Sequence, residues 1–168
     1  MASIHKEITI DASPDHVWDA LRDFGALHTR LVPGFVLDTR LDGDARIVTF
    51  SNGTVARELL VDCDDARRRL VYAVISERIK QHSASAQVFS DGDNRSRLVW
   101  IVDVLPHEIA PYMNAQMDLG AAAMQKALAR SAKVETGFAR RYALLTTNGA
   151  FSSGTPGPTL PENNFVAT

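Results

Sequence analysis

Hydrophobic and polar residues alternate at the beginning of the chain. Ile4, Ile8 and Ile10 fall on one side of an extended segment, and the residues between them are mostly polar. A period of two is typical of a β-strand that buries one face. The pattern therefore predicts a strand over residues 4–10.

Two short helices are predicted directly after this strand. Ser13 is a favourable N-cap, and Pro14 suits the first helical position. Apolar residues then recur at helical spacing, and Gly25 is expected to end the helix. A second short helix or turn is predicted over residues 26–32.

The next seventy residues contain six strand-like runs separated by short polar connections. The predicted strands cover residues 35–41, 45–50, 54–62, 70–75, 83–89 and 97–105. Asn52-Gly53 and Asp91-Gly92 are strong hairpin signals, because these residues tolerate a positive φ. Short connections between successive strands indicate an antiparallel meander.

A long helix is predicted from about residue 110 to at least 132, and helical spacing beyond it predicts a continuation to about residue 146, with Gly137 as the place for a break. The order of elements predicts an α+β fold, in which a seven-stranded antiparallel sheet curls around the long C-terminal helix. We expect one ligand-binding domain over residues 1–146, followed by an extended or mobile tail over residues 147–168. Small and flexible side chains on the helix, such as Gly120, leave room for an apolar cavity of several hundred Å³.

Composition excludes several classes of protein. The chain has 168 residues, 45% of them hydrophobic and 23% charged, with a formal net charge of −2. This balance fits one globular domain and gives no reason to expect nucleic-acid binding or a membrane span. The single Cys63 excludes an intramolecular disulfide, and no metal-ligand or cofactor-binding motif is present. The N-terminus has no apolar signal run, so we expect a cytoplasmic protein without cofactor or metal, as a monomer or homodimer.

Several segments resemble a known family. Residues 13–18 (SPDHVW) and 21–25 (LRDFG) resemble the opening motif of the polyketide cyclase/dehydrase and lipid-transport family, which belongs to the START-like, helix-grip (SRPBCC) superfamily. Residues 57–60 (RELL), 70–72 (LVY) and 98–100 (LVW) are similar to its strand pattern. The resemblance covers about residues 4–132. It implies a helix-grip fold with a deep apolar cavity between sheet and long helix, in a family that includes ligand carriers and aromatase/cyclases.

Aromatic and flexible side chains are the predicted cavity wall. Tyr72 and Trp100 lie on the apolar side of their strands, and each has a polar atom that needs a partner when buried. The segment PYMNA at residues 111–115 resembles a short motif of some aromatase/cyclases. Ordinary core packing is the alternative for all of these residues. The predicted ligand-binding residues are Tyr72, Trp100, Tyr112, Met113, Asn114, Met117, Gly120 and Met124.

Three residues are candidates for catalysis. His82 and His28 are candidates for moving a proton in a cyclisation or dehydration, because an imidazole side chain ordinarily titrates near neutral pH. Arg57 shares the parity of Val55 and Leu59, so it is expected to face the cavity and to orient an anionic or carbonyl group. A polar surface role is the alternative for each.

Three functions follow from these observations. The first is binding of a small hydrophobic ligand, which is polyketide-like, aromatic or lipid. The second is a cofactor-independent cyclase, aromatase or dehydratase that transfers protons in the same cavity. The third is an interaction module without a ligand. An enzyme requires at least two ionisable groups that converge in the cavity, so the test is whether a histidine and an arginine share it.

Overall fold

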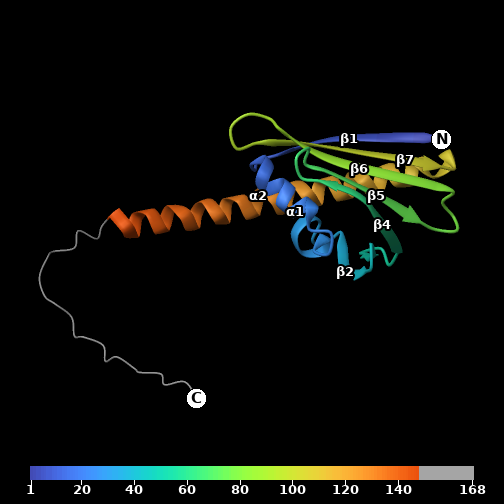
Figure 1. Ribbon diagram of the computed structural model, residues 1–168, viewed down its shortest axis with the longest axis horizontal. Coiled ribbons are helices and arrows are strands. Elements are labelled where there is room, and N and C mark those ends of the chain that lie inside the picture. The colour runs from blue at the N-terminus through green and yellow to red at the C-terminus, as the bar shows by residue number, and fades with distance from the viewer. Residues whose placement is uncertain (148–168) are drawn as a thin grey trace, which may run out of the picture.

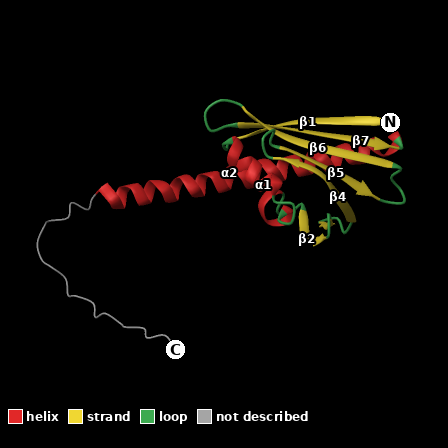
Figure 2. Ribbon diagram, viewed as in Figure 1, coloured by secondary structure: helices red, strands yellow, loops and turns green. Residues whose placement is uncertain are grey.

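The computed structural model describes residues 1–147, without the side chains of residues 130–132, 135 and 137–147. The predicted tail from residue 148 onward lies outside the described residues. The described chain forms a seven-stranded antiparallel sheet with helices against one side of it (Figures 1 and 2). The predicted α+β, helix-grip architecture is confirmed.

The sheet has the strand order β1-β7-β6-β5-β4-β3-β2, so the first two strands of the chain lie at opposite edges. Its strands are β1 (Ala2–Ile10), β2 (Val36–Asp42), β3 (Ala45–Phe50), β4 (Val55–Asp64), β5 (Arg69–Ile75), β6 (Gln81–Ser90) and β7 (Ser96–Leu105). The β3–β4 turn contains Gly53 at a φ of 83°. Its positive φ explains why a glycine follows Asn52 in this hairpin.

The connection between β1 and β2 contains two short helices, as predicted. In α1 (Pro14–Arg22), the Ser13 side chain accepts a hydrogen bond from the backbone N–H of His16 at 3.3 Å. The helix ends at Arg22, with Asp23 as its C-cap, rather than at Gly25. The following turn, η1 (Leu27–Leu31), has π-helical hydrogen bonding and buries both of its leucines.

The long helix α2 (Ala110–Thr147) follows a short 3₁₀ turn, η2 (His107–Ile109). Its first half lies along the sheet, and its second half extends beyond it (Figure 1). Two polar contacts fix α2 to β1: Lys6 Nζ lies 2.6 Å from Asp118 Oδ1, and Gln125 Nε2 donates to the Thr9 carbonyl at 3.0 Å.

The core lies between the inner face of the sheet and these helices. Strand β7 shows the pattern most clearly, since alternate residues are buried along its whole length. Trp100 is one of these buried residues and lies opposite Ala86 on β6. The alternation therefore places the Trp100 side chain under α2, where the helix has its small and flexible residues.

Candidate functional site

A cavity of about 170 Å³ lies between the inner face of the sheet, the first half of α2 and η1. It is smaller than the several hundred Å³ expected from the sequence. Seven of the eight predicted ligand-binding residues line it: Tyr72, Trp100, Tyr112, Met113, Met117, Gly120 and Met124. The exception is Asn114, which is exposed and donates to Asp118 Oδ2 on the outer side of the helix at 3.3 Å.

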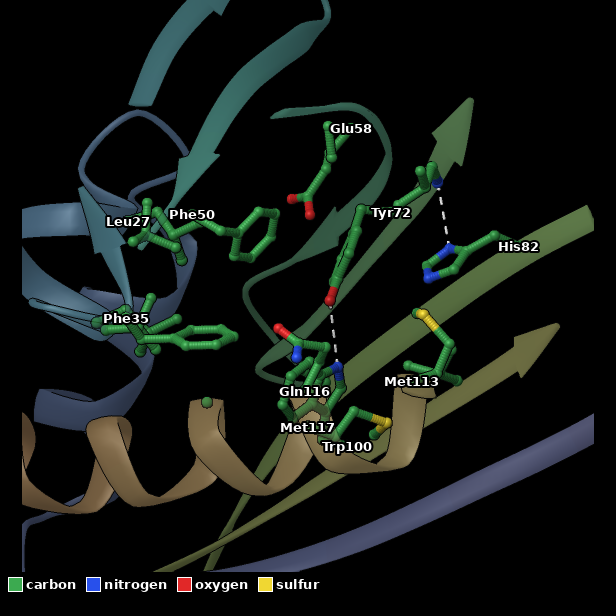
Figure 3. A pocket seen from close by; sticks show the side chains of 18 of the residues that line it. Leu27, Phe35, Phe50, Glu58, Tyr72, His82, Trp100, Met113, Gln116 and Met117 are labelled. Carbon is green, nitrogen blue, oxygen red and sulfur yellow. Dashed lines mark hydrogen bonds between the residues drawn. The ribbon is translucent and has the colours of Figure 1, made fainter. Parts of the chain in front are cut away.

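Trp100 and Tyr72 form one wall of the cavity (Figure 3). The indole Nε1 of Trp100 donates a hydrogen bond to the Tyr72 hydroxyl oxygen at 3.2 Å. Burial raises the pKa of Tyr72, and the negative charge of Glu58 raises it further. The Tyr72 hydroxyl therefore keeps its proton, which is available to donate to a bound molecule.

Gly120 allows the indole to lie directly against α2. A Cβ atom at position 120 would lie 3.2 Å from Cζ3 of Trp100 and 3.4 Å from Cε1 of Phe35. The distance to Trp100 is tighter than ordinary van der Waals contact, and the distance to Phe35 is at its lower limit. A larger residue at this position would therefore push the Trp100 ring into the cavity.

A buried ion pair, absent from the sequence predictions, lies at one end of the cavity. Nε of Arg46 donates to Oε2 of Glu58 at 2.7 Å, and Nη2 lies 2.6 Å from the same oxygen. Arg46 is 4% exposed and Glu58 is 6% exposed. The guanidinium also donates from Nη1 to the Phe24 carbonyl at 3.1 Å and lies 4.0 Å from the centre of the Phe24 ring. All three nitrogens of this cation are therefore engaged by the protein, and the cation also contacts an aromatic ring.

The expected inward orientation of Arg57 is wrong. Arg57 is on the outer face of β4, where Nε donates to Oδ2 of Asp42 at 3.3 Å, and its neighbour Glu58 faces the cavity. The parity argument failed because apolar residues on β4 also occupy the outer face: Val55 is 61% exposed. Position 57 therefore lies outside the cavity.

The sequence did contain a signal for the ion pair. The Asn52-Gly53 turn sets the register of β3 against β4, and this register places Arg46 directly opposite Glu58. Opposite charges at directly paired positions stabilise each other on either face of a sheet. The burial of the pair, however, depends on Phe24, which contacts Arg46 from outside the sheet and which hairpin register does not reveal.

His82 lines the cavity from β6, as a neutral imidazole. Its Nδ1 accepts a hydrogen bond from the backbone N–H of Val74 at 3.2 Å (Figure 3). Burial lowers the pKa of His82 to about 4, although Asp103 partly opposes the change. Because Nδ1 is an acceptor, the ring carries its proton on Nε2 and presents a hydrogen-bond donor.

His28 does not line the cavity. It lies in η1 beside the lining residue Leu27, and it is half-buried. Its Nδ1 is buried without a hydrogen-bond partner among the described residues. The structure therefore separates His28 from His82, and only His82 shares the cavity with an arginine, Arg46.

Cross-strand pairing explains how the polar groups come together. Arg46 on β3 pairs with Glu58 on β4, and Glu58 pairs with Val74 on β5. Val74 in turn donates to His82 on β6. Glu58 and His82 thus belong to one row across the sheet, separated by Val74, so their backbones lie about 10 Å apart at ordinary strand spacing.

Two other kinds of site are not found among the described residues. No cluster of three or more His, Cys, Asp or Glu side chains in this part of the chain has the arrangement to hold a metal ion. Within residues 1–147, no helix combines the length and the apolar character needed to cross a membrane.

The sequence matches the model of the family described as "Polyketide cyclase / dehydrase and lipid transport" over residues 1–134. No curated protein matches the chain significantly. A protein from Bacillus thuringiensis has a similar structure, with a TM-score of 0.68 and 20% identity, over 76% of this chain and 98% of that one.

Two further structures have the same fold. A START superfamily protein from Mycobacterium smegmatis has a TM-score of 0.60 at 13% identity, over 78% of this chain and 97% of that chain. Norcoclaurine synthase from Thalictrum flavum, a point mutant in complex with a transition state analogue, has a TM-score of 0.58 at 19% identity, over 77% and 95%.

Proposed function

Because the chain belongs to the polyketide cyclase/dehydrase and lipid transport family, we propose that it binds a small hydrophobic ligand between the sheet and α2. The observation that carries the proposal is the cavity of about 170 Å³, whose wall is mainly apolar. A dry apolar cavity of roughly 150 Å³ is known to accept one benzene molecule. The cavity volume therefore corresponds to one aromatic ring or an aliphatic group of similar size.

The partly exposed side chains among the lining residues indicate where a ligand enters the cavity. Tyr112 is 51% exposed at the beginning of α2 and also lines the cavity. Gln116 and Ile79 are half-buried lining residues. We place the opening between the start of α2 and the β5–β6 connection. A larger ligand would bind with one ring inside and the rest at this opening.

Toluene is a direct probe of this proposal. Titration of the full chain with toluene, followed by NMR chemical shifts, is expected to show saturable binding to a single site. Met117→Trp fills the cavity, because Met117 is a lining residue and only 2% exposed. Leu119→Trp is the matched control on the same helix, because Leu119 is 57% exposed.

We expect toluene binding to be lost in the Met117 variant and retained in the Leu119 variant. Equal binding by both variants, with both folded, would place the bound toluene outside the cavity. Absence of binding to the unmodified chain would contradict the proposal directly.

A second candidate function is proton transfer in the same cavity, as in a cofactor-independent cyclase, aromatase or dehydratase. The observation in its favour is that Glu58, Tyr72 and His82 all line one cavity with Arg46. In this geometry His82 donates from Nε2, so it is suited to polarise a ligand carbonyl. The Glu58 carboxylate is the group suited to accept a proton.

Exchange with solvent distinguishes an enzyme from a carrier. An enzyme of this kind is expected to catalyse deuterium incorporation next to the carbonyl of a bound aryl ketone, and Glu58→Gln is expected to slow it by about 10²–10⁴. A carrier gives no exchange above the rate in buffer.

Location in the cytoplasm, a monomeric or homodimeric state and the interaction-module hypothesis all stay predictions.

A further inference from the structure

We propose that the cavity selects an uncharged phenolic ligand, a single aromatic ring whose hydroxyl group donates a hydrogen bond to Glu58. This inference rests on the proposed function, since it assumes that the cavity binds a ligand. It adds the chemical class of that ligand, and it assigns Glu58 as the residue that determines specificity.

The charges around the cavity disfavour an anionic ligand. Arg46 is the one lysine or arginine among the described lining residues. Its Nε and Nη2 contact Glu58, its Nη1 donates to Phe24, and its guanidinium lies over the Phe24 ring. A carboxylate or phosphate brought into this space would have to compete with Glu58 for the same cation, and burial without a partner is costly.

The same ion pair also disfavours a cationic ligand. Glu58 is already neutralised by Arg46 at 2.6 Å. An ammonium group placed against the carboxylate would lie close to the guanidinium, and the two positive charges would repel each other in a poorly screened environment. Neutral molecules are therefore the class that enters at the lowest cost.

Glu58 nevertheless has acceptor positions that Arg46 does not fill. The contacts from Arg46 both fall on Oε2, whereas an ionised carboxylate has about four acceptor positions on its two oxygens. Figure 3 shows the carboxylate pointing into the space between Phe50 and Tyr72. A neutral ligand with a hydroxyl group supplies the donor, and a pure hydrocarbon leaves the position unfilled.

The apolar side chains favour an aromatic ring as the body of the ligand. Phe35 and Phe50 meet edge to face with ring centres 5.4 Å apart, and both line the cavity together with Trp100. The volume of about 170 Å³ fits one ring with a small substituent. Aromatic rings pack well against such edges and faces. The Tyr72 hydroxyl and His82 Nε2 then offer donors to an oxygen elsewhere on the ligand.

Four probes of similar size test the class on the unmodified, full-length chain. They are phenol, toluene, benzoate and benzylammonium, each titrated near pH 7 and followed by NMR. A hydrogen bond to a charged acceptor predicts that phenol binds about ten- to a hundredfold more tightly than its isostere toluene. Benzoate and benzylammonium are expected to bind more weakly than toluene.

Glu58→Gln tests the residue assigned to this selectivity. The variant keeps an acceptor for Arg46 but removes the negative charge, so the guanidinium is no longer neutralised. We expect the preference for phenol over toluene to fall at least fivefold, and benzoate binding to strengthen. Glu7→Gln is the matched control, because Glu7 is exposed on β1 and does not line the cavity.

The outcomes separate this inference from the proposed function. Equal affinities for phenol and toluene would overturn the phenolic class and leave hydrophobic ligand binding intact. Tightest binding of benzoate or benzylammonium would also overturn it. Failure of all four probes would overturn both proposals. The four-probe comparison does not depend on the folding of any variant.

Discussion

Replacing the buried ion pair by apolar residues gives a sharp test of the structure. The two single variants are Glu58→Leu and Arg46→Met, and the third protein combines them. Each single variant leaves one charge buried without its partner. The double variant removes both charges and leaves a purely apolar contact between β3 and β4.

The expected loss of unfolding free energy follows from the burial of the two charges and from the partners that each variant leaves in place. Removing one member of a buried ion pair typically costs about 3–5 kcal/mol of unfolding free energy. Glu58→Leu is expected near 3 kcal/mol on this scale, because Arg46 keeps its bond to the Phe24 carbonyl and its contact with the Phe24 ring. Arg46→Met is expected near 5 kcal/mol, because Glu58 loses both contacts with its cation. The double variant is expected to lose less than about 2 kcal/mol, since an apolar replacement of a whole pair is often neutral.

Urea unfolding of the full chain, followed by far-UV circular dichroism, measures these differences. Arg57→Met on the same strand is the matched control. Its partner is Asp42 at 3.3 Å, and the two side chains are 43% and 58% exposed. An exposed pair of this kind is worth less than about 1 kcal/mol. A double variant less stable than either single variant, or a control as destabilising as Arg46→Met, would refute the buried pair.

Two further predictions concern the cavity wall. The pKa of His82 is about 4 in the folded protein against 6.5 for the free side chain, so the unfolded state binds more protons between these two pH values. The contribution of His82 to the free energy of unfolding is therefore fully present above pH 6.5. It falls by about 3 kcal/mol as the pH drops to 4. His82→Phe should flatten urea midpoints measured across this range, and an unchanged slope would show that other groups cause it. Gly120→Val should force the Trp100 ring into the cavity and weaken toluene binding at least tenfold; undiminished binding by the folded variant would mean that this close contact does not set the cavity size.

The fold could be predicted from the sequence because a sheet that buries one face requires apolar and polar residues to alternate along its strands. The Ile residues of β1 and the alternate residues of β7 meet this requirement, and α1 has its N-cap and its proline where they were expected. Seven predicted cavity residues, Tyr72 and Trp100 among them, lie where the same alternation and helical spacing place them.

The polar part of the site was harder to predict, for two physical reasons. Strand β4 has apolar residues on both faces, so parity did not identify the buried one, and Arg57 was chosen instead of Glu58. Arg46 lies between Ala45 and Ile47 in a short strand, where a charged residue usually faces solvent. Its burial depends on Glu58, twelve positions away, and on Phe24 from another element. Local patterns do not contain tertiary contacts of this kind.

The position of β1 at the sheet edge has a consequence for synthesis of the chain. Its residues 2–10 pair only with β7, from Ala2 opposite Val104 to Ile10 opposite Ser96, and its polar contacts with α2 come from Asp118 and Gln125. The first strand to leave the ribosome therefore has no sheet partner until β7 has emerged. At about 5–20 residues per second this delay lasts roughly 5–20 seconds. During that interval β2 to β6 are free to form their successive hairpins, and the N-terminal strand closes the sheet last.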